Sequence, residues 1–495
     1  MIVDDIRYLV RQVIKDNEFA YRTYFVGGCV RDYVCGKDPK DIDVVVNIEN
    51  GSKILSRKLK EKYGKNITNP CNLGHYPIYS VTFTNDILIN GKLCKVSGIT
   101  IEIADTMKEE FHDLNSRQRN VEFASLEEDV LRRDFSINSG LISIMDGDVV
   151  DATTFNNDIQ NKIIRCNSGV DKDKIFSDDP LRILRGCVFH ARFGWEIENS
   201  TKEAMKRNGY RLEIVSKERI TSEIKKAFNV NFGAYRLVSI LNQLELLKYI
   251  FPHLESSKNV LQWISEKEHD IRNIHLEGCS VFHHNLSVLR HTKSGIINGF
   301  ASIFHDIGKT KECRQVVDGK VRFINHEYIG KKIAKKVLKE FYKLDNNTVN
   351  LICFLIENHM KMHQLVELND KNLRRFINET ENEEKRQYLF DLCNADSLGT
   401  LIKYDDGSID GNLAHYEIQE RINDLIEKDR NSICKSIYLF NGNELMQILD
   451  IKKPCKFVGE AKKILLEIQY EYGNDIDKEF AKQLLIERFN SIVNS

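Results

Sequence analysis

The spacing of apolar residues changes near residue 150, and this change limits the folds open to the chain more than any other feature. Before that point, apolar and β-branched residues gather in short runs: YFVGG, DIDVVVN, IYSVTFT and ITIEIA. Such runs are typical of β-strands, and the Asn90-Gly91 pair favours a tight hairpin. The first 150 residues are therefore predicted to form an α/β segment.

Beyond residue 150 the apolar residues take the spacing of helices. Ile333, Val337 and Phe341 recur at i, i+4 and i+8, which places them on one helix face. No proline occurs between Pro252 and Pro454, and a proline-free stretch suits a long run of helices. The sequence therefore predicts an α+β protein, with its sheet at the N-terminal end and helical domains after it.

The composition indicates a soluble, globular protein. The chain has 495 residues, of which 42% are hydrophobic and 29% charged, and this length suits roughly two to four domains. Its twelve cysteines include no CxxC pair, which favours reduced thiols over a zinc clip or a disulfide framework. No apolar run approaches the roughly 20 residues that cross a bilayer, and the acidic start, MIVDDIRYLV, is unlike a signal peptide. We expect a cytoplasmic protein without membrane association.

The net charge is −1, so any affinity for nucleic acid has to come from a local patch. Residues 181–226 carry eleven Lys and Arg against six Glu, in a stretch that also has helical spacing. Two interpretations of this stretch stay open, a surface for RNA or a solvated helix face.

A pair of glycines precedes a pair of acids. Gly27 and Gly28 end an apolar run, and Asp41 and Asp43 begin the next one. Because side chains alternate along a strand, the two carboxylates share a face and repel each other unless a cation lies between them. Mg²⁺ suits such ligands, and two metal ions can activate a 3′ hydroxyl while neutralising a leaving pyrophosphate. The glycines would let the backbone approach a triphosphate.

A third carboxylate is predicted at Glu102, which alternates with the apolar Ile101 and Ile103 and so faces away from the core. Each pattern has an ordinary alternative, because a DxD can be an exposed edge strand and a GG can be a turn. Their combination with Arg31 and Asp32 favours the functional interpretation.

These motifs resemble a known family. GGCVRD followed by DIDVVV is similar to the head domain of the class II CCA-adding enzymes and bacterial poly(A) polymerases. Similar motifs follow in order: LEEDVLRRDFSIN (126–138), SDDPLRILRGCVFHARFGW (177–195), KERITSE (217–223) and a C-terminal NGNELMQIL. The resemblance covers nearly the whole chain and implies a mixed-sheet, polymerase β-like nucleotidyltransferase head followed by an all-α neck and body.

The resemblance also implies roles for single residues. Asp41, Asp43 and Glu102 would be the catalytic acids, with Mg²⁺ on Asp41 and Asp43. Asp179 and Arg182 would share a helix face and read the incoming base, or form only an i, i+3 salt bridge. The predicted nucleotide-binding residues are Gly27, Gly28, Arg31, Arg133, Asp134, Asp179, Arg182 and Arg185.

Some positions depart from the family pattern. Asp105, Thr106 and Met107 stand where the family usually has Thr-aromatic-Arg, which weakens the carry-over to Glu102. Val188 stands where an arginine is common. In RRDFSIN, Asn138 is either a functional residue or a helix cap.

A second set of motifs, HHNLSVLRH, FASIFHDIGK, FINHEYIG, ENHMKMH and NADSLG, resembles an HD-type metal phosphohydrolase domain. His305 and Asp306, adjacent in an apolar helix, are costly to bury unless they are hydrogen-bonded or bound to metal. His284 and Asp396 would complete a mixed nitrogen and oxygen shell, suited to Mn, Ni, Co or Zn.

Other histidines are candidates for this centre. His326 and His359 would bind a second metal or a phosphate, and His363 has a weaker claim. His283 lies beside His284, but His284 fits the HxLxVL pattern. The domain either hydrolyses phosphate esters or serves only as a platform for RNA.

The resemblance implies four parts: a nucleotidyltransferase head (1–150), a helical neck and body (151–270), an HD domain (271–400) and a helical tail (401–495). The expected function is template-independent addition of CCA to the 3′ end of tRNA, from CTP and ATP. The alternatives are addition of A alone, of CC or of a poly(A) tail, or an HD-type nucleotide or RNA phosphohydrolase. The oligomeric state stays open.

Overall fold

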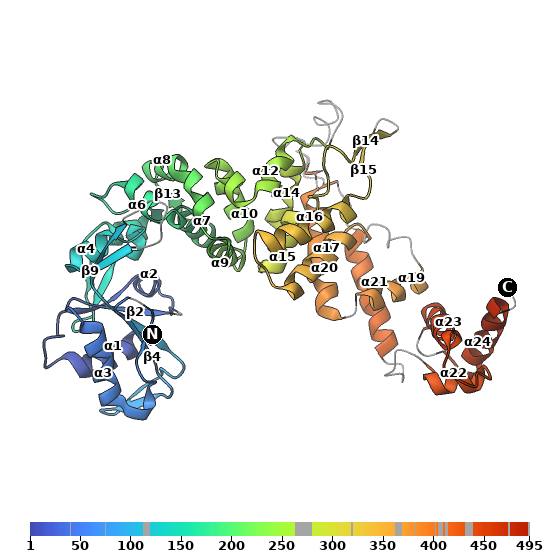
Figure 1. Cartoon of the computed structure of the whole chain (residues 1–495), viewed down its shortest axis with the longest axis horizontal. Coiled ribbons are helices and arrows are strands. Elements are labelled where there is room, and N and C mark those ends of the chain that lie inside the picture. The colour runs from blue at the N-terminus through green and yellow to red at the C-terminus, as the bar shows by residue number, and fades with distance from the viewer. Residues whose placement is uncertain are drawn as a thin grey trace. The chain divides into compact units, whose positions relative to one another are not determined.

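The computed structural model in Figure 1 divides into two compact units. It describes residues 1–39, 41–74, 76–111, 119–262, 280–317, 320–361, 369–380, 382–400, 402–403, 409–410, 414–430, 439–473 and 476–493. The first unit comprises Met1–Ala227 and Arg236–Ile250, and the second comprises Phe228–Tyr235 and Phe251–Ser495. The domain boundary predicted near residue 270 lies outside the described residues.

The first unit contains a seven-stranded sheet in the order β11-β10-β1-β2-β7-β4-β3. Its strands are β1 (Thr23–Val26), β2 (Ile42–Val46), β3 (Cys71–Asn72), β4 (Ile78–Thr82), β7 (Thr100–Asp105), β10 (Leu141–Ser143) and β11 (Val149–Val150). Strands β2 and β7 are parallel, whereas the other neighbours are antiparallel. The predicted mixed sheet at the N-terminal end is confirmed.

Apolar side chains cover both faces of this sheet. Its accompanying helices are α1 (Ile2–Ile14), α2 (Gly28–Val34), α3 (Gly51–Tyr63) and α4 (Leu126–Leu131). On one face, Phe25 and Val44 belong to the large buried core that includes α1 and α3. On the other face, Val26 and Val45 pack with Val130 of α4 in a smaller cluster. Because side chains alternate along a strand, Asp43 lies on the α4 face.

Two hairpins form separate two-stranded sheets in the first unit. The first joins β5 (Ile87–Ile89) to β6 (Lys92–Cys94) through Asn90 and Gly91, whose φ angles are 50° and 76°. Two positive φ angles suit the Asn-Gly type I′ turn, so the predicted hairpin is confirmed. The second hairpin pairs β8 (Met107–Phe111) with β9 (Arg119–Phe123).

Short helices complete the first unit. They are α5 (Phe155–Asn161), α6 (Lys172–Asp178), α7 (Leu181–Phe193), α8 (Asn199–Asn208), α9 (Lys217–Phe228), α10 (Gly233–Gln243), which also extends into the second unit, and α11 (Leu247–Ile250). A short parallel pair, β12 (Ile163–Ile164) and β13 (Glu196–Ile197), lies among them. Helix α7 starts after Pro180 and stops at Gly194, whose φ of 70° suits a residue without a side chain.

The second unit is mainly helical. Its longer elements are α12 (Pro252–Ser256), α14 (Val281–His291), α15 (Ile296–Phe304), β14 (Arg314–Val317), β15 (Lys320–Phe323), α16 (His326–Glu340), α17 (Asn346–Asn358), α19 (Asp370–Glu379), α20 (Glu383–Gly399), α21 (Ala414–Arg430), α22 (Gly442–Ile448), α23 (Lys456–Tyr472) and α24 (Lys478–Val493). The predicted apolar stripe lies on α16, where Val337 is buried, although Phe341 falls one residue beyond the helix. No described helix is long and apolar enough to span a membrane.

Candidate active site

The predicted acids of the first unit meet at the centre of the sheet. Asp43 on β2 is the register partner of Glu102 on β7, and the two strands run parallel. Register partners project to the same side of a sheet, so both carboxylates lie on the α4 face. Asp41 is exposed and comes directly before β2. The structure therefore brings together the three acids that the sequence predicts.

The electrostatics of this group favour a bound cation. The pKa of Asp43 is raised to about 6, chiefly by burial and also by the neighbouring charges of Glu102 and Asp41, against the lowering effect of Arg133. A cavity of about 200 Å³ opens beside the acids. Its polar lining consists of Asp43, Tyr76, Glu102, Glu109, Asp129, Arg132 and Arg133.

Gly27 is a glycine for two reasons. Its φ is 78°, a conformation that side chains rarely allow. A Cβ atom at this position would lie 3.2 Å from Oδ2 of Asp43 and 3.7 Å from Nη1 of Arg133. The backbone at the β1–α2 turn therefore lies directly against the acid and the arginine, and the absent side chain leaves room there for a ligand.

Asp129, on α4, fixes two arginines beside the acids. Its side chain is fully buried, and it accepts hydrogen bonds from Nη2 of Arg132 and Nη2 of Arg133, both at 2.7 Å. Burial alone would raise the pKa of Asp129, but the charges of Arg133 and Arg132 outweigh burial and lower it. The ionised carboxylate of Asp129 therefore holds both guanidinium groups in place beside the cavity.

A chain of hydrogen bonds joins α2 to α7. Arg31 donates to Asn138 at 2.6 Å, Asn138 donates to Asp134 at 2.9 Å, and Arg185 donates to Asp134 at 2.7 Å. Burial alone would raise the pKa of Asp134, but Arg185 outweighs it and the pKa is lowered. The guanidinium of Arg31 also lies 4.9 Å from the ring centre of Phe193. Asn138 thus bonds across the fold and is not a helix cap.

Asp179 and Arg182 are close in sequence but do not pair. Asp179 precedes α7, where it accepts a hydrogen bond from the backbone N–H of Leu181, so the two residues do not share one helix as predicted. Its carboxylate pairs at 3.1 Å with Arg219 of α9. Within the described residues, Arg182 makes no side-chain hydrogen bond or ion pair.

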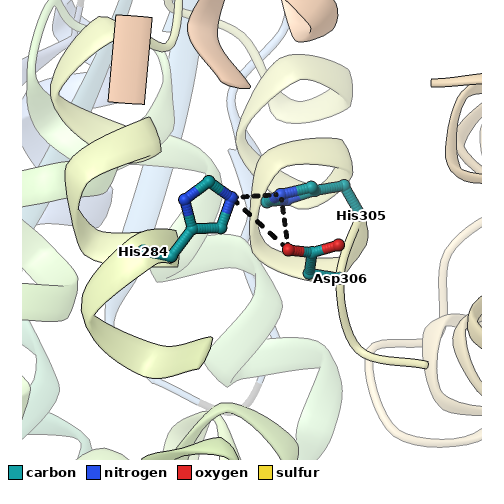
Figure 2. A group of neighbouring side chains, drawn as sticks. All are labelled: His284, His305 and Asp306. Atoms are coloured by element: carbon teal, nitrogen blue, oxygen red, sulfur yellow. Dashed lines mark hydrogen bonds and ion pairs between the residues drawn. The ribbon is translucent and has the colours of Figure 1, made fainter. Parts of the chain in front are cut away.

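The second predicted cluster forms in the second unit. His284 comes from α14, whereas His305 and Asp306 directly follow α15. Figure 2 shows the three side chains converging, with 3.2 Å between the Nε2 atoms of His284 and His305. Oδ2 of Asp306 lies 3.4 Å from each of these nitrogens, and Oδ1 of Asp396 on α20 lies 3.0 Å from His284. We call this group, with His326 and His359, the HD centre.

Asp306 serves two sides of the HD centre. Its Oδ2 faces His284 and His305, whereas its Oδ1 lies 3.4 Å from His326 and 3.8 Å from His359. Two overlapping sets of three residues, His284-His305-Asp306 and Asp306-His326-His359, have the spacing of metal ligands. One carboxylate is therefore placed between two candidate metal positions.

Hydrogen bonds orient three of the histidines for metal binding. Nδ1 of His305, His326 and His359 lies within 2.9 Å of a backbone carbonyl three residues earlier. A carbonyl only accepts, so each Nδ1 carries a proton, and each Nε2 is the ring atom left to face a metal ion in the centre. Nε2 of His326 is buried without a hydrogen-bond partner. This orphaned nitrogen and the mixed donor set fit a divalent transition metal.

The charges of the HD centre also suit a cation. Burial alone would lower the pKa of His305, but Asp306 and Asp396 raise it to about 10. Burial, with the charge of His305, lowers the pKa of His359 to about 4. The ring of His283 contacts Ser280, whereas His284 faces the HD centre. The predicted His363 lies outside the described residues.

Comparison with known proteins places the chain among enzymes that act on RNA ends. The sequence models of the Poly A polymerase head domain, of the "Probable RNA and SrmB- binding site of polymerase A" and of the HD domain match residues 23–165, 194–258 and 296–401. The Multifunctional CCA protein of Acinetobacter baumannii is 26% identical over 390 residues, 77% of this chain and 85% of that protein. The CCA-adding enzyme of Bacillus cereus is 28% identical over 264 residues, 53% and 59% of the two chains. The chain belongs to the tRNA nucleotidyltransferase and poly(A) polymerase family.

Solved structures share the fold of this nucleotidyltransferase. The CCA-adding enzyme of Bacillus stearothermophilus in complex with CTP has a TM-score of 0.60 at 18% identity, covering 100% of this chain and 99% of that one. The Thermotoga maritima enzyme complexed with tRNA-CCA has a TM-score of 0.57 at 17% identity, covering 98% and 94%. The nucleotidyltransferase head and the HD domain both use divalent metal ions.

Some residues of the two candidate sites escaped the sequence prediction. Asp129 could have been found, because it lies three and four residues before Arg132 and Arg133 in a helical segment. Arg219 lies in the KERITSE motif, but only the approach of α9 to Asp179 gives it a partner. Lys309, in the HDIGK motif, lies 2.6 Å from Asp306.

Proposed function

We propose that this nucleotidyltransferase adds CCA to the 3′ end of tRNA, taking CTP and ATP and releasing pyrophosphate. The observation that carries the proposal is the pairing of Asp43 with Glu102 across parallel strands, against the side-chain-free backbone of Gly27. The names of the relatives, and the solved complexes of the family with CTP and with tRNA, support the choice of substrates.

Asp41, Asp43 and Glu102 would hold Mg²⁺, whose preference for carboxylate and phosphate oxygens fits these donors. When bound, Mg²⁺ supplies the charge that activates a 3′ hydroxyl and stabilises a leaving pyrophosphate. Arg133 lies between the acids and Asp129, so its fixed guanidinium would bind the triphosphate beside Gly27.

Asp179 and Arg182 would select the base. Arg219 holds the carboxylate of Asp179, whereas Arg182, which has no side-chain partner among the described residues, can offer its donors to an incoming base. An acceptor and a fork of donors can match the hydrogen-bonding edge of cytosine or adenine. Arg31, Asp134 and Arg185 would act indirectly, because the hydrogen bonds that connect them through Asn138 fix α7 against α2.

The proposed function assigns a role to each part of the chain. Residues 1–150 would be the catalytic head, 151–270 the neck and body that read the base and bind RNA, 271–400 the HD domain and 401–495 the tail. The basic stretch 181–226 would contact the tRNA backbone. A protein that completes tRNA ends would work in the cytoplasm.

The direct experiment incubates the purified protein with Mg²⁺ and a tRNA that lacks its 3′ CCA, with each labelled nucleotide alone and with CTP and ATP together. We expect CTP to add first and ATP only after two cytidines. Addition of A alone, of CC alone or of a long A tail would assign the protein to another activity of the same family. Failure to incorporate any nucleotide would contradict the proposal.

We also propose that the HD centre is a phosphohydrolase. The specific observation is the orphaned, buried Nε2 of His326, beside an Asp306 placed between two sets of ligands. Imidazole ligands favour Mn, Ni, Co or Zn over Mg²⁺, so hydrolysis of a 2′,3′-cyclic nucleotide should need one of those ions. Absence of hydrolysis with all four ions would contradict this proposal and would favour a role of the HD domain as a platform for RNA.

A further inference from the structure

Helix α16 carries a stripe of lysines on its solvent side. Lys332, Lys335, Lys336 and Lys339 are all exposed. At about 100° per residue, these four side chains fall within roughly a third of the helix circumference, opposite the buried side of the helix. We call them the α16 lysine stripe.

The charge of this stripe is not compensated nearby. Residues 309–343 contain eleven Lys and Arg against four Asp and Glu, although the whole chain has a net charge of −1. Within the described part of the chain, none of the four lysines forms an ion pair, whereas the neighbouring Lys331 pairs with Glu357 at 2.7 Å. Their ammonium groups are therefore available to an anionic partner.

An aromatic side chain continues the stripe. Tyr328 is 51% exposed, and the ammonium of Lys332 lies 4.2 Å from its ring centre. From Tyr328 to Lys339 the stripe is about 16 Å long at 1.5 Å per residue. A row of lysines with an exposed ring fits a nucleic-acid strand, since lysines meet phosphates and rings stack on bases.

The stripe starts beside the HD centre. His326 is the first residue of α16, so Tyr328 lies in the helical turn that holds one of the proposed metal ligands. Arg322, exposed on β15, precedes His326 by four residues, and Lys309 contacts Asp306 itself. Positively charged side chains thus lie along α16 and beside the proposed metal ligands of the HD centre.

We propose that the α16 lysine stripe binds the backbone of an RNA strand and delivers its 3′ end to the HD centre. The substrate is then a phosphodiester at the end of a polynucleotide, rather than a free nucleotide; this rests on the proposed phosphohydrolase function. Water adds to phosphorus, one P–O bond to ribose breaks, and the released ribose oxygen takes a proton. The reaction needs no oxidant or further substrate.

The test uses the full-length protein with its transition metal and two substrates, a 2′,3′-cyclic mononucleotide and an RNA oligonucleotide that ends in a 2′,3′-cyclic phosphate. Replacing Lys332, Lys335, Lys336 and Lys339 with Ala should lower kcat/KM for the RNA at least about tenfold, and should change kcat/KM for the mononucleotide less than about twofold. For the RNA, kcat/KM should fall less steeply with salt in the variant. The slope of log kcat/KM against log salt concentration should decrease in magnitude by about 0.7 for each phosphate that the variant no longer neutralises.

Two controls complete the test. Replacing the same four lysines with Arg keeps the charge and should keep RNA hydrolysis, and Lys331→Ala removes a lysine that is already paired. Equal losses on both substrates, or no loss on the RNA, would overturn the role of the stripe. If the unmodified protein hydrolysed neither substrate with any of the metals, the phosphohydrolase function would fail and this inference with it.

Discussion

Asp129 has no exposed surface, and its two carboxylate oxygens hold the guanidinium groups of Arg132 and Arg133. We predict that Asp129→Asn lowers the free energy of unfolding by about 1–3 kcal/mol, because an amide cannot bond both cations. The KM for nucleotide should also rise more than kcat falls, since Arg133 would lose its fixed place beside Asp43.

Urea unfolding and steady-state kinetics measure the two effects. Glu122→Gln is a suitable control, because Glu122 is a surface acid of the same unit that pairs with the half-buried Lys108. A normal KM for nucleotide in Asp129→Asn would contradict the role assigned to Arg133.

Single residues were predictable from the sequence where local geometry decides their place. Strand alternation puts Asp43 and Glu102 on one face, whatever the rest of the fold does. The partner of Asp179 was not predictable, because Arg219 lies forty residues later and reaches it only through the packing of α9. Asn138 was ambiguous for the same reason, since its partner Arg31 lies on a distant helix.

At the scale of elements, ion pairs connect helices of the C-terminal part. Glu471 at the end of α23 accepts hydrogen bonds from Arg488 of α24 at 2.6 Å and from Lys371 of α19 at 2.5 Å. The bond from Arg488 is the main cause that lowers the pKa of Glu471 to about 2, with Lys371 adding to it. The carboxylate therefore stabilises the folded helices above its ordinary pKa, and this contribution is lost as the pH falls from about 4.5 towards 2.

We predict that Glu471→Gln destabilises the protein at pH 7 by about 1 kcal/mol or less, because these partly exposed charges are screened by solvent. Unfolding followed by circular dichroism at steps from pH 7 to pH 3 should show the difference shrinking with acid. A difference that grows as the pH falls would contradict the sign of this contribution.

Elements with a strong local signal matched the sequence prediction. The Asn90-Gly91 turn fixes its hairpin by dihedral preference, and the apolar spacing fixes α16. Strands β3, β11 and β12 have two residues each and carry no period of their own. These strands are recognised only by their pairing with neighbouring strands, which the sequence does not show.

At the scale of the whole molecule, the two proposed reactions use separate units. The acids, the glycines and the base-selecting residues belong to the first unit, whereas every residue of the HD centre belongs to the second. We predict that the double variant His305→Ala, Asp306→Ala loses phosphohydrolase activity and still adds nucleotides to tRNA. A variant that is folded by circular dichroism but adds no nucleotides would show instead that the two units are coupled.

The central claim is that the carboxylates beside Gly27 carry out nucleotide addition, and Asp43→Ala tests it most directly. The measurement is the single-turnover rate of CMP addition to a tRNA without its 3′ end, at saturating Mg²⁺, with tRNA affinity measured in parallel. The rate should fall by several orders of magnitude while the affinity for tRNA stays within about threefold, because a ligand of the catalytic metal is lost and the RNA surface is not. A variant that kept more than about a tenth of the wild-type rate would contradict the claim.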